Sequence, residues 1–308
     1  MRELAVVLGA LYLRGLARPF ACGRRGWPRV DHILRRSGCG LIEASSVLRA
    51  GGMETEALVL DSPGVLASAE DHYEAGAFLT AACAGYPARW LRLGVGAPPA
   101  LWQVGSSLNS SAWSPSITVV GSRSLSGGEA AFAHEVGELA AASGLVLVSG
   151  AAPGADVASQ RSALASDGRV VALLPCGVSA GWRGQGLAST VLSLCAPWEP
   201  FALVHAMERN ALLYAASPWS AVVAVRRGEG GTWHGATSAL RRRLGGLLVF
   251  APDGVASPGG AALVALGAQS VSSASQAVGA VVATFGSFGS FGSAGSDGAG
   301  LFGLVGVG

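Results

Sequence analysis

Five short apolar runs, separated by longer stretches of helical character, dominate the chain from residue 117 to residue 250. Each run is five to seven residues long, and polar residues do not alternate with the apolar ones. Strands that are apolar on both sides are typical of a parallel sheet covered by helices on both faces. The sequence therefore predicts an α/β fold with a Rossmann-like parallel sheet flanked by helices. The predicted strands are ITVVG (117–121), LVLVSG (145–150), RVVALLP (169–175), SAVVAV (220–225) and GLLVF (246–250).

The stretch between the first two predicted strands has the periodicity of an amphipathic helix. Four apolar residues recur at helical spacing within residues 128–143 and form one face. They are Phe132, Val136, Leu139 and Ala140. Gly144 follows directly, and glycine is the residue that most often ends a helix. We therefore expect a helix over 128–143.

Composition divides the rest of the chain into segments. Residues 1–105 have helical character interrupted by glycine and proline, which predicts a small helical N-terminal domain with a connector. Residues 106–116 are rich in serine and asparagine and predict a linker, so we expect the sheet domain over 117–268. Serine, glycine and alanine dominate residues 269–308. Such a segment cannot bury enough apolar surface to offset its ordering, and we predict a flexible tail.

Every fixed positive side chain is an arginine, because the sequence contains no lysine. The lack of lysine excludes an ordinary P-loop ATPase and Schiff-base chemistry. Arginine suits phosphate recognition, since the guanidinium donates paired hydrogen bonds and stacks on bases. The net charge of +2 is low for a nucleic-acid-binding protein, so charge alone does not predict DNA binding.

The cysteines and histidines predict neither disulfides nor a metal centre. The five cysteines, at positions 22, 39, 83, 176 and 195, show no CxxC spacing, and the five histidines form no HExxH motif. We expect reduced thiols in a cytoplasmic protein, with no metal and no cofactor. No apolar run is long enough to cross a bilayer, so we predict no membrane association.

A loop rich in glycine and serine follows the first predicted strand and leads into the predicted helix. In an open α/β sheet, ligands bind beyond the carboxyl ends of the strands, and N–H groups at a helix start attract anions. The hydroxyl and guanidinium groups of the loop would add donors for a phosphate. The same loop also suits a tight turn with a surface arginine, and the loop alone does not separate the two. Its candidate residues are Gly121, Ser122, Arg123, Ser126 and Gly127.

Two further loops are expected at the same edge of the sheet. The second strand ends at Ser149 and Gly150, and Asp156 follows, for which we favour a helix cap over a role in orienting a loop. A glycine-rich loop, residues 228–235, follows the fourth strand and contains Trp233. This tryptophan could stack on a base, but partly buried packing is the more common role.

One motif points to hydrolase chemistry and is rejected. Residues 177–181 read Gly-Val-Ser-Ala-Gly, the pattern of a nucleophile elbow. Such a site needs an acid and then a late histidine along the chain. No histidine follows Asp253, and His234 precedes it. We therefore do not expect a serine hydrolase.

Several motifs in a fixed order give the chain a resemblance to a known family. Between about Gly85 and Pro252 the sequence contains GYPARWLRL, PPALWQVG, ITVVGSR, LVLVSGAAPGAD, RVVALLP, MERNALL, GGTWHGA and LLVFAPDG. Together these segments resemble the DprA (Smf) family of DNA-processing proteins. The resemblance implies a homodimeric, Rossmann-like protein without enzymatic chemistry of its own. It also implies that the protein binds single-stranded DNA and loads a RecA-type recombinase in recombination and natural transformation.

The resemblance also implies a set of DNA-binding residues. Ser122 and Arg123 would contact phosphates, and Ser149 and Gly150 would line the same pocket. The other residues expected to bind nucleic acid are Gly121, Ser126, Gly127, Arg209, Asn210, Gly231 and Thr232. The chain departs from the family pattern where it carries Pro153, Gln160, Ala211 and Gly235.

Two other functions stay open at this point. One is a nucleotide-binding or nucleotide-cleaving protein similar to the lysine-decarboxylase-like phosphoribohydrolases. Those enzymes place a catalytic glutamate shortly after a Pro-Gly-Gly-x-Gly-Thr loop, whereas here Gly230–Thr232 is followed by Ala236, Thr237 and Ser238, with no acid. The other is a non-catalytic interaction protein that has lost DNA binding, which the low net charge permits.

Overall fold

The computed structural model describes residues 2–13, 26–37, 40, 43–106, 113–179, 186 and 188–286. A nine-stranded sheet forms its centre, with the strand order β1-β2-β6-β5-β4-β3-β7-β8-β9. The strands from β6 to β9 in this order pair in parallel, and β1 and β2 add an antiparallel edge. The predicted Rossmann-like α/β fold is therefore confirmed, with an antiparallel edge in addition.

The strands of the sheet are short and mostly buried. They are β1 (Phe78–Thr80), β2 (Ala100–Gly105), β3 (Ser116–Val120), β4 (Val146–Ser149), β5 (Val170–Leu174), β6 (Thr190–Ser193), β7 (Trp219–Val222), β8 (Gly246–Phe250) and β9 (Gln269–Val271). All five predicted strands are present, as β3, β4, β5, β7 and β8.

The helices precede the sheet or connect its strands. They are α1 (Arg2–Leu13), α2 (Gly26–Ser37), α3 (Ala44–Ala50), α4 (Glu54–Leu60), α5 (Pro63–Glu74), α6 (Gly127–Ala142), α7 (Ala155–Ala165), α8 (Leu203–Ala216), α9 (Gly230–Arg242), α10 (Pro258–Ala265) and α11 (Ala274–Gly286). Two 3-10 segments, η1 (Ala88–Gly96) and η2 (Pro252–Gly254), complete the set. The helix predicted over 128–143 is α6, and Gly144 after it has a positive φ of 66°.

The order of the parallel strands indicates where a ligand crevice forms. From β3 the chain builds outward through β4, β5 and β6 on one side and through β7, β8 and β9 on the other. The direction of winding therefore reverses between β3 and β7. In doubly wound sheets the connecting loops diverge at such a point and leave a crevice beyond the carboxyl ends of the strands.

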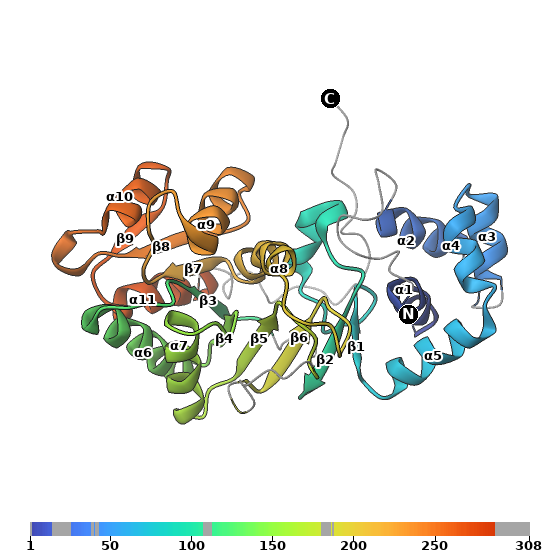
Figure 1. Ribbon diagram of the computed structural model, residues 1–308, viewed down its shortest axis with the longest axis horizontal. Coiled ribbons are helices and arrows are strands. Elements are labelled where there is room, and N and C mark those ends of the chain that lie inside the picture. The colour runs from blue at the N-terminus through green and yellow to red at the C-terminus, as the bar shows by residue number, and fades with distance from the viewer. Residues whose placement is uncertain are drawn as a thin grey trace.

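Helices cover both faces of the sheet. Helices α6, α7 and α11 lie on one face, and α8, α9 and α10 lie on the other (Figure 1). Under α6 the apolar core contains Phe132, whose ring stacks on Phe250 of β8 at a centroid distance of 4.1 Å. The central parallel strands β3, β4, β5, β7 and β8 are thus buried on both sides, which is why their sequences are apolar without alternation.

The N-terminal helices pack against the antiparallel edge of the sheet. Helix α1 is almost entirely apolar, and its residues from Leu4 to Tyr12 are buried. The ring of Tyr12 contacts Phe78 of β1 and Trp102 of β2, and its hydroxyl donates to the carbonyl oxygen of Leu194 just beyond β6. One apolar core therefore joins the helical region to the sheet.

The predicted limits of the sheet were wrong at both ends. Strands β1 and β2 lie inside the segment 1–105 that was predicted to be helical, and β9 and α11 lie inside the predicted tail, 269–308. Strands of three to six residues carry too little pattern to be recognised among helices and loops. In α11, the buried residues Ala277, Val278 and Val281 form an apolar face that the high content of small residues obscured.

The predicted linker, residues 106–116, is only partly described. Residues 107–112 lie outside the described residues, as do residues 287–308 with most of the Phe-Gly-Ser repeats. Trp113 is buried, and its indole donates a 2.7 Å hydrogen bond to the carbonyl of Gly85. The end of this segment is therefore packed. Among the described residues, no helix is long and apolar enough to cross a membrane.

Candidate nucleic-acid interface

A cavity of about 430 Å³ lies at the reversal point between β3 and β7. Four loops that follow parallel strands line it together with one side of α8. Its lining includes Gly121, Ser122, Arg123, Ala152, Asp156, Phe201, Leu203, Arg209, Asn210, Tyr214, Arg226, Gly230, Gly231 and Thr232. Seven of the predicted site residues are thus brought together in one place: Gly121, Ser122, Arg123, Arg209, Asn210, Gly231 and Thr232.

The β3–α6 loop reaches the cavity through close backbone packing. A Cβ atom at Gly121 would lie 2.6 Å from the Cβ of Ala155, so only glycine allows α7 to approach here. The carbonyl of Ser122 accepts a hydrogen bond from the backbone N–H of Ala155 at 3.2 Å. The side chain of Arg123 is exposed at the cavity. This loop therefore presents a fixed backbone and a guanidinium open to solvent.

Ser126 and Gly127 do not line the cavity. Ser126 caps α6, because its hydroxyl accepts from the backbone N–H of Glu129 while the Glu129 carboxylate accepts from the N–H of Ser126. This reciprocal arrangement is a capping box. The predicted phosphate donors at these two positions are exposed at the start of the helix, outside the cavity lining.

Ser149 and Gly150 lie beneath the cavity and do not line it. Ser149 is fully buried, and its hydroxyl donates to the carbonyl of Val119 at 2.8 Å, which joins β4 to β3. Gly150 is buried as well. The expectation that these residues line the pocket is therefore not met, because the Ser149 hydroxyl bonds to β3 and the backbone groups of Gly150 bond to the side chains of Asp156 and Arg209.

Asp156 orients the β4–α7 loop and does not cap α7. The N-cap position is Gly154, whose φ of 93° favours glycine. The Asp156 carboxylate accepts hydrogen bonds from the backbone N–H groups of Gly150 at 3.1 Å and Ala152 at 3.2 Å. The prediction of a helix cap was wrong, and the alternative of loop orientation holds. Burial raises the pKa of Asp156 to about 6, against opposing effects of Arg209 and the two N–H groups.

Arg209 is a buried arginine whose hydrogen bonds go to the backbone. Its side chain is on α8 with only 6% of the residue exposed, and Nη1 donates to the carbonyls of Gly150 at 2.7 Å and Leu173 at 2.5 Å. Burial lowers its pKa, while Asp156 opposes that change. Arg209 thus ties α8 to the ends of β4 and β5 and places a positive charge beneath the cavity.

Hydrogen bonds join the β7–α9 loop to the β3–α6 loop and to α8. Thr232 donates from Oγ1 to the carbonyl of Gly121 at 2.9 Å, and the Tyr214 hydroxyl donates to the carbonyl of Thr232 at 3.2 Å. Asn210 donates from Nδ2 to the carbonyl of Gly231 at 3.4 Å. Trp233 is partly buried against the apolar core, in agreement with the packing role expected for it.

Two groups of residues that line the cavity differ in whether their side chains are already bonded within the protein or exposed to solvent. We call Asp156, Arg209 and Thr232 the crevice floor, because each already makes hydrogen bonds to backbone groups. A second group, which we call the crevice rim, consists of three exposed residues: Arg123, Arg226 and Phe201. The described salt bridges lie elsewhere on the chain, so these two arginines face solvent unpaired.

The apolar side of this rim was not predicted from the sequence. Phe201 is 54% exposed, and Trp198, in the same β6–α8 loop, is 74% exposed. Leu203, Val204 and Met207 extend the exposed apolar surface onto the first turns of α8. The sequence contained a signal for part of this surface, because consecutive apolar residues such as Leu203 and Val204 at the start of a helix cannot both face the core.

The Gly-Val-Ser-Ala-Gly motif has a packing role in its described part. A Cβ atom at Gly177 would lie 2.0 Å from the carbonyl oxygen of Ala196 and 2.3 Å from that of Pro197. The backbone of the β6–α8 loop lies directly against this glycine, and the N–H of Gly177 donates to the carbonyl of Glu199 at 2.7 Å. Ser179 likewise donates from its N–H to the carbonyl of Pro197 at 2.7 Å.

Comparison with known proteins gives a family and two similar folds. The model of the family described as DNA recombination-mediator protein A matches residues 77–281, which is more than half of the chain. DNA processing protein A from Streptococcus pneumoniae is 21% identical with a TM-score of 0.64, over 87% of this chain and 96% of its own. DNA processing protein A from Helicobacter pylori, which has a single-stranded DNA binding mode, is 20% identical with a TM-score of 0.57, over 67% of this chain and 96% of its own. No curated protein matches the sequence.

Proposed function

Because the chain belongs to the DNA recombination-mediator protein A family, we propose that it binds single-stranded DNA at the crevice rim. The observation that carries the proposal is the pair of exposed arginines, Arg123 and Arg226, beside the start of α9 in one cavity. Phosphates attract arginine forks and the N–H groups at a helix start. Phosphate contacts of this kind position a strand without reading its sequence.

Bases would occupy the apolar side of the same rim. Phe201 lines the cavity, and Trp198 is exposed in the same loop. Proteins that bind single strands without sequence preference combine a basic groove with aromatic side chains on which bases stack. In a duplex the bases are already stacked on one another, so this arrangement favours a single strand.

The floor supports binding from below. Arg209 contributes positive charge at the cavity, but its Nη1 hydrogen bonds hold the ends of β4 and β5. We place Ser149, Gly150, Asn210 and Thr232 in the same supporting role, with Gly121 allowing the close approach of α7 and Gly231 accepting the hydrogen bond of Asn210. Pro153 and Ala211, where the chain departs from the family pattern, carry no charge. We therefore assign the larger share of the affinity for DNA to the rim arginines.

Membership of the family supports a more specific proposal for the role. We propose that the protein acts as a homodimeric recombination mediator in the cytoplasm and loads a RecA-type recombinase on single strands, including during natural transformation. In this role it changes the partners of DNA and breaks no covalent bond. A nucleotide-cleaving role would need an acid after the glycine-rich loop, where Ala236, Thr237 and Ser238 stand.

The direct test is fluorescence anisotropy of labelled oligo-dT, titrated with the full chain across a salt series. Single strands should bind more tightly than a duplex of equal length, and log K should fall with log salt at about −0.7 per phosphate contacted. Arg123→Ala should weaken binding. Arg169→Ala is the matched control, because Arg169 is exposed directly before β5, at the opposite end of the strands.

Three results would contradict the proposal. They are no single-strand binding at low salt, equal losses in Arg123→Ala and Arg169→Ala, and tighter binding of the duplex. Release of a free base from nucleoside monophosphates would favour the phosphoribohydrolase alternative.

A further inference from the structure

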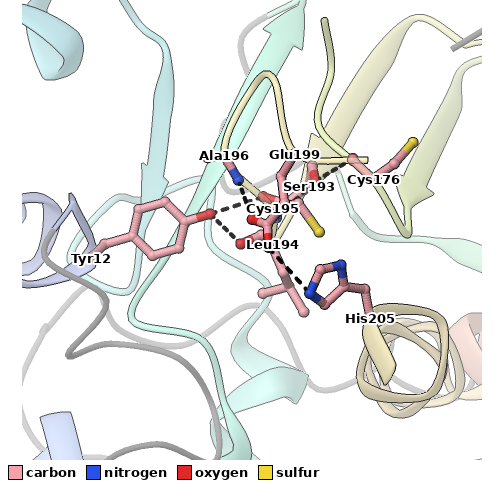
Figure 2. Close-up of polar contacts among 8 residues, drawn as sticks. All are labelled: Tyr12, Cys176, Ser193, Leu194, Cys195, Ala196, Glu199 and His205. Atoms are coloured by element: carbon pink, nitrogen blue, oxygen red, sulfur yellow. Dashed lines mark hydrogen bonds and ion pairs between the residues drawn. The ribbon is translucent and has the colours of Figure 1, made fainter. Parts of the chain in front are cut away.

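A cysteine, a glutamate and a histidine lie close together at the β6–α8 loop, outside the lining of the crevice. Cys195 lies two residues beyond β6, Glu199 lies in the loop, and His205 lies in the first turn of α8. One ligand atom from each lies within 4.8 Å of the others. Figure 2 shows the three side chains converging, while the sulfur of Cys176 points away from them. None of the three residues lines the crevice.

The contacts of Glu199 resemble those of a metal ligand. Its Oε1 lies 3.3 Å from Nε2 of His205, and its Oε2 accepts a 3.1 Å hydrogen bond from the backbone N–H of Ala196. Zinc bonds of about 2.0–2.3 Å at tetrahedral angles place two ligand atoms roughly 3.3–3.8 Å apart. One carboxylate oxygen is thus held by the backbone, as outer-shell partners hold ligands in metal sites, and the other already lies at a ligand–ligand distance.

His205 is a buried member of the cluster whose imidazole can bind a metal ion. The residue is 8% exposed, and its Nδ1 has no hydrogen-bond partner among the described residues. A buried polar atom without a partner loses its hydration and gains nothing in exchange. A neutral imidazole that donates from one nitrogen carries a lone pair on the other, and that lone pair binds metal ions. In this cluster the nitrogen that faces Glu199 is Nε2, so a cation would bind there while Nδ1 keeps the ring proton.

We propose that Cys195, Glu199 and His205 bind one Zn²⁺ ion. A thiolate, an imidazole and a carboxylate form a ligand set that suits zinc, whereas Mg²⁺ and Ca²⁺ prefer oxygen ligands alone. The ligand atoms need to close from within 4.8 Å to tetrahedral spacing, which side-chain torsions of the two loop residues can provide. A water molecule takes the fourth position. This site departs from the expectation that the chain holds no metal.

The ion would tie the β6–α8 loop to α8. This loop carries Trp198 and Phe201, the two most exposed aromatic residues beside the crevice. Its backbone already bonds to the segment after β5 through Gly177 and Ser179. Zinc between Cys195 and His205 would close the loop from its other side. The site therefore fixes the position of an apolar surface, and it does so whether or not that surface binds DNA.

Zinc stoichiometry tests the site directly. The full chain, stripped with chelator and then dialysed against micromolar ZnCl₂, should retain one more zinc per chain than Cys195→Ser when measured by inductively coupled plasma mass spectrometry. Cys176→Ser is the matched control and should retain as much as wild type, because that sulfur points away from the cluster. Cobalt(II) in place of zinc should give a thiolate charge-transfer absorption that Cys195→Ser loses.

Two further measurements keep the proposal testable where the buried cysteine variant folds poorly. Glu199→Gln changes a side chain that is 22% exposed and should weaken zinc binding at least about tenfold, the loss that follows even when a residue that only orients a ligand is changed. Zinc should also slow chymotrypsin cleavage after Trp198 and Phe201 in wild type but not in Glu199→Gln. Equal zinc content in wild type, Cys195→Ser and Glu199→Gln would overturn the proposal, as would cleavage that zinc leaves unchanged.

Discussion

The crevice floor and the crevice rim line the same cavity, yet the polar groups of the floor are hydrogen-bonded within the protein and those of the rim are exposed to solvent. On the floor, Asp156, Arg209 and Thr232 all make hydrogen bonds to backbone groups of the protein. On the rim, Arg123 and Arg226 are exposed, beside the exposed ring of Phe201. A group that is already bonded within the protein stabilises the fold, whereas an exposed one is available to a ligand. Substitutions should therefore separate stability from binding.

The largest effect is expected at the floor. Arg209→Ala would remove the positive charge beside the buried Asp156 and leave the carbonyls of Gly150 and Leu173 without their donor. Hydrogen bonds from a charged group contribute about 1.5–3 kcal/mol each, so the loss of both should cost roughly 3–5 kcal/mol of stability. Urea unfolding measures this loss. Arg169→Ala should stay within about 0.5 kcal/mol of wild type, and a loss of less than about 1 kcal/mol in Arg209→Ala would remove the distinction between floor and rim.

The next effect concerns the apolar side of the rim. Phe201→Ala should weaken oligo-dT binding by about 1–3 kcal/mol, the typical loss of one stacked base. The salt slope should stay the same, because no charge is removed. Val204→Ala is the control, since Val204 is similarly exposed nearby but does not line the cavity. Equal affinities of the two variants would show that Phe201 does not stack on DNA.

The smallest effect is a pH dependence of the floor. The pKa of Asp156 is raised in the fold from 3.8 to about 6, so the folded protein binds this proton more tightly than the unfolded chain does. Its stabilising contribution is complete below pH 3.8 and is lost as the pH rises through 6. Stability should therefore fall by roughly 1 kcal/mol between about pH 5 and pH 7.5 from this group.

Asp156→Asn isolates that contribution. The variant has no titrating group at this position, so its free energy of unfolding should change less between about pH 5 and pH 7.5 than that of wild type. Thermal or urea unfolding at the two pH values measures the difference. Identical pH profiles for the variant and wild type would mean that Asp156 is not protonated near pH 6 in the fold.

The central sheet was predictable from the sequence because each central strand is buried on both faces. An unbroken apolar run as short as residues 145–150 is typical of a strand covered on both sides. The strand order, and with it the reversal between β3 and β7, is known from the structure alone. The short strands β1 and β9 were missed, since three residues carry no usable pattern. Their positions depend on what packs beside them, which a local pattern does not contain.

The candidate site was predicted by position but not by role. Sequence motifs placed Arg209 at the cavity, whereas Ser149 lies beneath it, because whether a side chain faces solvent or the sheet depends on loops from distant parts of the chain. Asp156 illustrates the same limit, because its partners are backbone groups of its own loop. Cys195, Glu199 and His205 are separated by spacings that match no common metal motif, and only the fold of the loop brings them together.

The most direct test of the division between floor and rim is the salt dependence of oligo-dT binding in two variants. Arg123→Ala/Arg226→Ala should bind more weakly and flatten the slope of log K against log salt by about 1.4, which is two phosphate contacts. Thr232→Val removes a floor hydrogen bond worth about 1 kcal/mol of stability and should leave the slope unchanged. A double variant whose slope equals that of wild type would contradict the account, as would a Thr232→Val slope flattened as much as that of the double variant.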